Sequence, residues 1–219
     1  MPLLENIAKV KKNIAAAARS AGRDPDEVTL VAATKVQTSE TIRAAIAAGI
    51  TVCGENRVQE LTAHLADYAY DGARVHFIGH LQTNKVKYVV GRVDLIESVD
   101  SPRLLEVNIA GEESKGGCPA SELPTLARLA RSAGHVRLRG LMCIPPVAAA
   151  PGDNCMFFRK TRQLFVDIRM EMGDNDSDID CLSMGMSGDY EDAVREGATL
   201  VRVGTALFGP RPPVHAGTV

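Results

Sequence analysis

The sequence lacks several features that would place it in a broad class of proteins. No apolar run is long enough to span a membrane or to act as a signal peptide. The charges nearly balance, with a formal net charge of -2 over 219 residues, which argues against a nucleic-acid-binding surface. We therefore expect a cytoplasmic protein that has no nucleic-acid or membrane partner.

Cysteine and histidine are scarce, and their spacing indicates neither a metal site nor a disulfide framework. The five cysteines form no C-x-x-C pair, and Cys53, Cys143 and Cys181 fall inside predicted strands. We expect buried thiols, which are neither ligands nor disulfides. The five histidines are not predicted to form a metal site.

Strand and helix patterns alternate along the chain, which predicts a parallel sheet with helices outside it. The composition, 45% hydrophobic, suits a single domain over residues 1–219. A leading helix begins at Pro2 and ends at Gly22. The predicted strands are 29–35, 51–56, 75–80, 95–100, 105–112, 137–144, 180–186 and 200–208. Eight parallel strands predict a closed (β/α)8 TIM-type barrel with an extra N-terminal helix and no C-terminal β domain.

The connection between the fourth and fifth predicted strands is too short. Only the sequence Ser-Pro-Arg-Leu (101–104) separates them, whereas a parallel crossover needs a dozen or more residues. Either the chain lacks the fourth outer helix and pairs locally in another way, or a mobile segment is absent from this sequence. We favour the second alternative, because a barrel without one outer helix exposes a broad apolar flank.

Lys35 is the only basic side chain in the first predicted strand, and it lies at the C-terminal end of that strand. Parallel α/β folds place their chemistry where the strands end, and an amine there can condense with a carbonyl. The alternative is a strand-terminal charge that reaches water. Lys35 is therefore a candidate Schiff-base lysine.

Small residues that expose backbone amides follow the seventh predicted strand and end the eighth. Ser187 can cap a helix that begins near Asp189, and Gly204 and Thr205 add donors from the adjoining strand. Each segment alone is compatible with an ordinary turn, but barrels hold phosphate in these loops. A carbonyl-reactive lysine beside a phosphate site suits a phosphosugar substrate or pyridoxal phosphate, and these residues alone favour neither.

Five motifs resemble the pyridoxal-phosphate homeostasis protein family, the stand-alone relatives of the alanine racemase barrel (fold type III). The similarity runs in the same order from the first helix to about Pro210. The motifs are VAATK (31–35), GENRVQE (54–60), HFIGHLQTNK (76–85), SMGMS (183–187) and VRVGTALFG (201–209).

The resemblance implies that pyridoxal phosphate is the cofactor and gives roles to three residues around its ring. Lys35 would form the Schiff base, Asn56 would lie beside the ring, and Arg202 would face the pyridine nitrogen. A guanidinium does not give up its proton under ordinary conditions, so the ring would stay neutral and would be a weak electron sink.

The resemblance also implies residues for the phosphate and for the mouth of the site. Ser187, Gly204 and Thr205 would hold the phosphate, and His80 would line the mouth. Another interpretation of His80 is a strand-end histidine that a backbone carbonyl satisfies.

The resemblance favours a carrier over an enzyme. The related racemase takes a second acid/base from an added C-terminal domain and a partner subunit, and we expect no such domain because this chain stops at Val219. We expect a monomer that holds pyridoxal phosphate reversibly, supplies it to pyridoxal-phosphate-dependent apoenzymes and acts in vitamin B6 and amino-acid homeostasis. The alternatives are a slow amino-acid racemase and a cofactor-free lysine-dependent aldolase.

Overall fold

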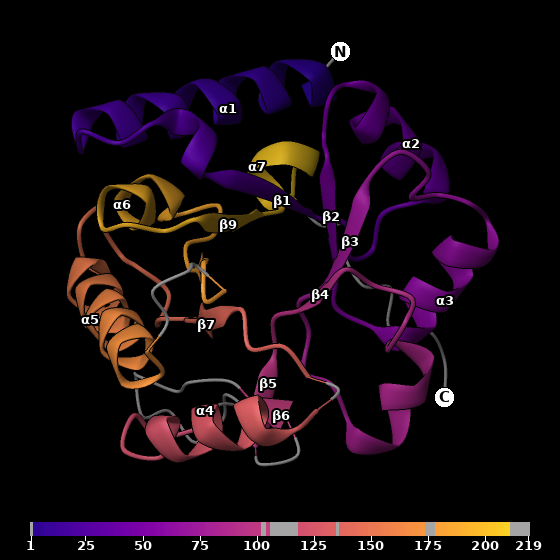
Figure 1. Ribbon diagram of the computed structural model, residues 1–219. Helices are drawn as coiled ribbons and strands as arrows, with labels where there is room; N and C mark the ends of the chain where they lie inside the picture. The colour runs from indigo at the N-terminus through magenta and orange to yellow at the C-terminus, as the bar shows by residue number, and fades with distance from the viewer. Residues whose placement is uncertain (1, 102–103, 106–117, 135, 174–177, 211–219) are drawn as a thin grey trace.

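A computed structural model describes residues 2–101, 104–105, 118–134, 136–173 and 178–210 (Figure 1). Seven parallel strands form one curled sheet in the order β4-β3-β2-β1-β9-β8-β7. The strands are β1 (Thr29–Ala33), β2 (Val52–Glu55), β3 (Arg74–Phe77), β4 (Leu95–Ile96), β7 (Gly140–Met142), β8 (Cys181–Ser183) and β9 (Leu200–Val203).

The central strand, β1, is an apolar run that is buried from Leu30 onward. Such a run fits a strand that is covered on both faces of a parallel sheet. In register, Val31 pairs with Val52 of β2 on one side and with Arg202 of β9 on the other. The carboxyl ends of these three strands therefore meet at one edge of the sheet.

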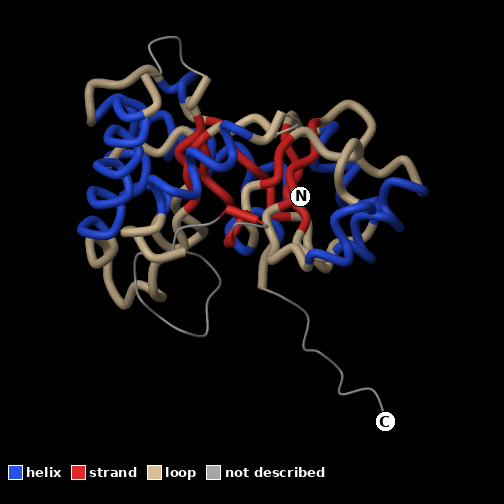
Figure 2. The backbone as a smooth tube through the Cα atoms, turned by 60° about the horizontal axis from the view of Figure 1, so that its bottom comes forward, coloured by secondary structure: helices blue, strands red, loops and turns tan. Residues whose placement is uncertain are grey.

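The helices surround the curled sheet, as Figures 1 and 2 show. They are α1 (Pro2–Ser20), α2 (Ser39–Ala47), α3 (Val58–Ala66), α4 (Leu123–Ser132), α5 (Cys155–Glu171), α6 (Tyr190–Arg195) and α7 (Thr205–Phe208), with short 3-10 helices η1 (Pro25–Glu27) and η2 (Thr83–Tyr88). The predicted N-terminal helix is confirmed. Its buried face includes Ile7, Val10 and Ile14 at helical spacing, and it ends before Gly22, which has a φ of 69°.

The short connection between the fourth and fifth predicted strands forms a local antiparallel pair of strands. β5 (Val99–Ser101) runs antiparallel to β6 (Leu104–Leu105), with Val99 opposite Leu105. This is the local pairing of the first alternative, and the second, that a segment is absent from the sequence, stays a prediction. The predicted strand 95–100 is thereby divided into β4 and β5, and most of the predicted strand 105–112 lies outside the described residues. The α/β class and the TIM-like curl are confirmed, and the seven parallel strands form a half-barrel whose edges are β4 and β7.

The predicted strand 200–208 is wrong in its second half. β9 ends at Val203, and Thr205–Phe208 forms the short helix α7. The backbone turns at Gly204, whose carbonyl accepts from the amide of Phe208 at 2.9 Å. The apolar pattern alone did not separate a strand from a strand followed by one helical turn.

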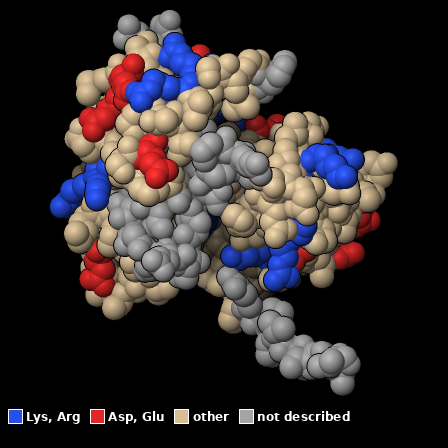
Figure 3. Space-filling model, turned by 90° about the horizontal axis from the view of Figure 1, so that it is seen from below, with Lys and Arg blue, Asp and Glu red and all other residues tan. Residues whose placement is uncertain are grey.

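Other expectations concern the cysteines and the surface. Cys53, Cys118 and Cys143 are buried as predicted, whereas Cys155 and Cys181 are half-buried. Basic and acidic side chains are interspersed on the face shown in Figure 3. Among the described residues, no helix combines the length and apolarity needed to cross a membrane.

Candidate functional site

A cavity of about 380 Å³ lies at the carboxyl edge of the sheet. This volume lies in the range of small-molecule sites, about 300–1,000 Å³. The residues that line it lie near the carboxyl ends of six strands, which are β1, β2, β3, β7, β8 and β9. The cavity forms because the curl of the sheet brings these strand ends together. Six of the seven predicted site residues line it: Lys35, Asn56, Ser187, Arg202, Gly204 and Thr205.

His80 lies elsewhere. It is exposed and lines an adjoining hollow of about 580 Å³, together with Arg57 and Lys85. Asn56 borders both spaces, so His80 is a neighbour of the cavity and not part of its lining.

Lys35 is half-buried and lies two residues after the end of β1. The residue before it, Thr34, is fully buried, and both its amide and its Oγ1 donate to the carbonyl of Gly54, at 2.9 and 3.1 Å. These two bonds fix the backbone on the N-terminal side of Lys35 to the end of β2.

Asn56 follows β2 and carries an unsatisfied acceptor. Its Oδ1 is buried and has no hydrogen-bond partner among the described residues. A buried polar atom without a partner is unfavourable by about 1–3 kcal/mol, which makes this amide a candidate ligand-binding group. The backbone of Asn56 is closely packed, because a Cβ added at Gly79 would lie 2.0 Å from its carbonyl oxygen.

A buried carboxylate, that of Glu55, precedes Asn56 in the chain and contacts its backbone amide. Glu55 is fully buried, and it accepts from the Asn56 amide at 2.7 Å and from the Tyr70 hydroxyl at 3.1 Å. Desolvation of the charged form raises the pKa of Glu55. Burial, together with the Glu55 charge, likewise raises the pKa of the Cys53 thiol to about 12.

Arg202 reaches the cavity from β9 and is only 4% exposed. Its Nη1 donates to Ser183 Oγ at 2.5 Å, and its Nη2 donates to the carbonyl of Cys143 at 2.9 Å. A guanidinium has five N–H donors, so these two bonds do not exhaust it. Among the described residues, the carboxylate oxygen nearest to Nη1 is Oε2 of Glu97, at 4.0 Å.

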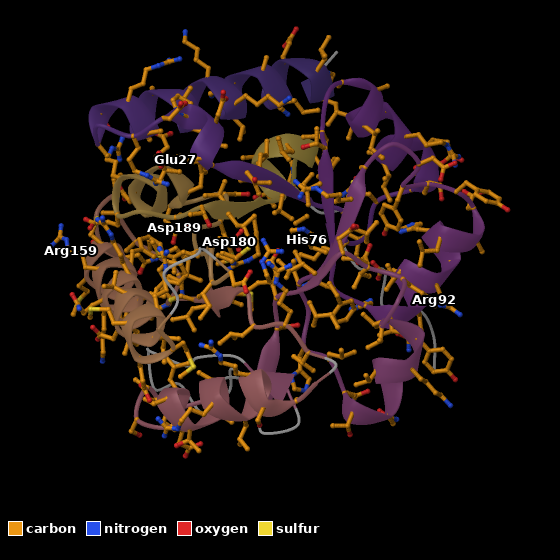
Figure 4. All side chains as sticks on the ribbon, in the orientation of Figure 1. Glu27, His76, Arg92, Arg159, Asp180 and Asp189 are labelled. Carbon is orange, nitrogen blue, oxygen red and sulfur yellow. The ribbon has the colours of Figure 1, made fainter. Side chains whose placement is uncertain are left out.

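A buried polar network connects Arg202 to the opposite side of the half-barrel. Ser183 donates to one oxygen of Glu97, and the other oxygen lies 2.7 Å from Nδ1 of His76. Figure 4 shows His76 inside the curl of the sheet, whereas Arg92 and Arg159 lie at the periphery of the molecule. Sequence reasoning missed Glu97 and Ser183, because their separation of 86 residues leaves no local pattern.

The loop after β8 contacts the start of α7 through Ser187. Its Oγ accepts from the amides of Gly204 at 3.1 Å and Ala206 at 3.2 Å. Both lone pairs are then used, and the hydroxyl proton is left for another acceptor. The prediction that Ser187 caps the next helix is wrong: Asp189 is the N-cap residue of α6, and its Oδ1 accepts from the amide of Met186 at 2.7 Å.

The cavity has few ionisable side chains. Of the described residues that line it, only Lys35 and Arg202 are ionisable, and the other lining side chains are apolar, amide, hydroxyl or glycine. The arrangement combines one amine with hydrogen-bond donors and one buried cation.

The chain is similar in sequence and in structure to several known proteins. The family model for the N-terminal domain of alanine racemase matches residues 6–212. The chain is 39% identical over 227 residues to the pyridoxal phosphate homeostasis protein of Pseudomonas aeruginosa, covering 95% of this chain and 96% of that one. Two solved structures are similar: an unknown protein of Bifidobacterium adolescentis (TM-score 0.86, 37% identity, 94% of both chains) and PipY of Synechococcus elongatus with PLP bound (TM-score 0.76, 33% identity, 94% of this chain and 100% of that one).

Proposed function

This chain belongs to the pyridoxal phosphate homeostasis protein family, and we propose that it binds pyridoxal phosphate reversibly through Lys35. We further propose that it acts as a monomeric cytoplasmic carrier that buffers the cofactor and supplies it to apoenzymes. In this role it would influence vitamin B6 and amino-acid balance without turning over a substrate.

The observation that carries the proposal is the convergence of three chemical groups on one cavity. A half-buried amine, an unsatisfied amide oxygen and a hydroxyl with a spare proton come from Lys35, Asn56 and Ser187, which lie at the ends of different strands. These groups fit an aldehyde-bearing, phosphorylated ring. A phosphosugar also carries a carbonyl and a phosphate, but the PLP-bound structure of a relative at 33% identity favours pyridoxal phosphate.

Each group would have one role. The Lys35 amine would form an imine with the cofactor, and Asn56 would contact the ring beside it. Ser187 and Thr205 would bind the phosphate with hydroxyl and amide donors, and the Gly204 amide would exchange its bond to Ser187 Oγ for one to the phosphate. When bound, pyridoxal phosphate supplies an aldehyde and an electron-withdrawing ring. His80, in the adjoining hollow, would lie outside this contact set.

Two features support a carrier over a racemase. A guanidinium does not give up its proton under ordinary conditions, so Arg202 would donate a hydrogen bond to the ring nitrogen without protonating it. Racemisation also needs an acid/base on each side of the substrate, and Lys35 is the one ionisable group besides Arg202 in the described lining.

The test is reductive trapping of the cofactor. The protein, incubated with pyridoxal phosphate and reduced with borohydride, should gain one stable adduct on the peptide that contains Lys35. Lys35→Ala should gain none, whereas Lys85→Ala, changed at the edge of the adjoining hollow, should behave as the parent does.

Retention of a covalent adduct by Lys35→Ala would refute the assignment of the lysine. The carrier role has a separate test, in which alanine is added to the loaded protein. Racemisation at about 1 per second or faster would replace the carrier with an enzyme.

A further inference from the structure

The turn that carries Lys35 is strained at the next residue. The Gln37 amide donates to the carbonyl of Thr34 at 3.0 Å, which closes a four-residue turn with Lys35 and Val36 in the middle. Val36 has a φ of 59°, in the left-handed region. A β-branched residue rarely adopts this conformation, and a turn that needs it at the third position prefers glycine. A contact from outside the turn must therefore stabilise Val36.

That contact is a hydrogen bond from the Val36 amide to the Glu60 carboxylate, at 3.0 Å. Glu60 lies in the first turn of α3, and its second oxygen accepts from Nη1 of Arg57 at 3.3 Å. The Glu60 side chain is 23% exposed, so it is partly shielded from water. Hydrogen bonds to an ionised acceptor are stronger than neutral ones, and this bond acts on the strained residue itself.

The backbone on both sides of Lys35 is thus attached to the β2–α3 segment. Thr34 is held on one side by the carbonyl of Gly54, and Val36 is held on the other by Glu60. We propose that Glu60 is a positioning residue, which holds Val36 in its left-handed conformation and so directs the Lys35 amine to the cavity. The inference rests on the proposed role of Lys35 and assigns to Glu60 a role in how readily that amine reacts.

The physical consequence concerns the orientation of the amine. Without the Glu60 carboxylate, Val36 is free to relax to a negative φ, and the peptide between Lys35 and Val36 then rotates. A reacting group that is displaced from its productive geometry reacts more slowly. Glycine at position 36 adopts the left-handed conformation without steric strain, so it should need no such support.

The experiment compares four variants by the rate at which pyridoxal phosphate forms its visible imine absorbance. Glu60→Ala should slow imine formation about tenfold or more, the equivalent of one lost hydrogen bond to a charged group. Glu60→Gln keeps an acceptor oxygen for Val36 and should stay within about threefold of the parent. Adding Val36→Gly to Glu60→Ala should restore most of the rate. The control is Glu40→Ala, which changes an exposed first-turn glutamate of α2 and should have no effect.

Three results would overturn the inference: a parental rate in Glu60→Ala, a Glu60→Gln variant as slow as Glu60→Ala, or no rescue by Val36→Gly. A second readout needs no cofactor. Hydrogen exchange of the Val36 amide should be faster in Glu60→Ala than in the parent, and unchanged exchange refutes the anchoring bond. A parent that forms no imine would refute the role of Lys35, and the exchange measurement would still decide whether Glu60 holds the turn.

Discussion

A methyl group added at Gly79 should disturb the candidate site by displacing the backbone of Asn56. Gly79 follows β3, and a Cβ built on it would lie 2.0 Å from the carbonyl oxygen of Asn56 and 2.6 Å from its carbonyl carbon and Cα. All three atoms belong to the backbone, so no side-chain rotation relieves the overlap. Gly79→Ala therefore requires the two chain segments to separate.

The size of the effect follows from these distances. Cβ atoms essentially never approach another heavy atom within 3.0 Å, so the Asn56 backbone must move by about 1 Å. Overpacking of this kind destabilises a protein by about 1–3 kcal/mol, and contact with rigid backbone favours the upper end. At about 2–4 °C per kcal/mol for a chain of this size, the melting temperature should fall by roughly 6–12 °C.

Two measurements check this prediction. Thermal unfolding gives the stability of Gly79→Ala, and retention of pyridoxal phosphate on dialysis reports on the displaced Asn56. The control is Gly134→Ala, because a Cβ at Gly134 meets nothing within 4 Å. That variant should stay within about 0.5 kcal/mol of the parent.

A Gly79→Ala variant that melts with the parent and retains cofactor equally well would refute this reasoning. If Gly79→Ala is less stable but retains pyridoxal phosphate as well as the parent does, the packing argument would hold and the proposed role of Asn56 would not. In that case Asn56 would be removed from the site.

Three further predictions concern the phosphate loop, the buried network and pH. Ser187→Ala and Thr205→Val should each weaken phosphate binding by about 1.5–3 kcal/mol, seen as faster loss of colour on dialysis against free phosphate; equal retention in both would remove them from the site. Glu97→Ala leaves the buried Arg202 cation without its nearest carboxylate and should lower the free energy of unfolding by about 3–5 kcal/mol in urea denaturation, and a loss below about 1 kcal/mol would contradict the network. Burial raises the pKa of Glu55 above its ordinary 4.5, so the folded state keeps this proton to higher pH than the unfolded state does. The stability from this group is complete below pH 4.5 and falls as pH rises through the folded pKa. Glu55→Gln should therefore lose less stability than the parent as the pH rises above 4.5, and equal losses would show that Glu55 does not contribute to this pH dependence.

The sequence alone determined the elements that depend on local pattern. The apolar run of β1 and the helical spacing of α1 were predictable from the sequence. Hydrophobic periodicity and helix-ending residues such as Gly22 are local signals, because they depend only on residues close together in the chain. Lys35 was predictable as a candidate site residue for the same reason, since it lies just after the end of an apolar strand. Motif resemblance then supplied Asn56 and Arg202, which the fold places with Lys35 around one cavity.

Only the tertiary structure decided how these residues are held. The left-handed turn at Val36 has no local signal, because a valine predicts the opposite conformation and the stabilising carboxylate is 24 residues away. The network from Ser183 to Glu97 joins segments 86 residues apart, across the curl of the sheet. Contacts of this kind depend on which strand ends the fold brings together, and no residue of either segment encodes its partner.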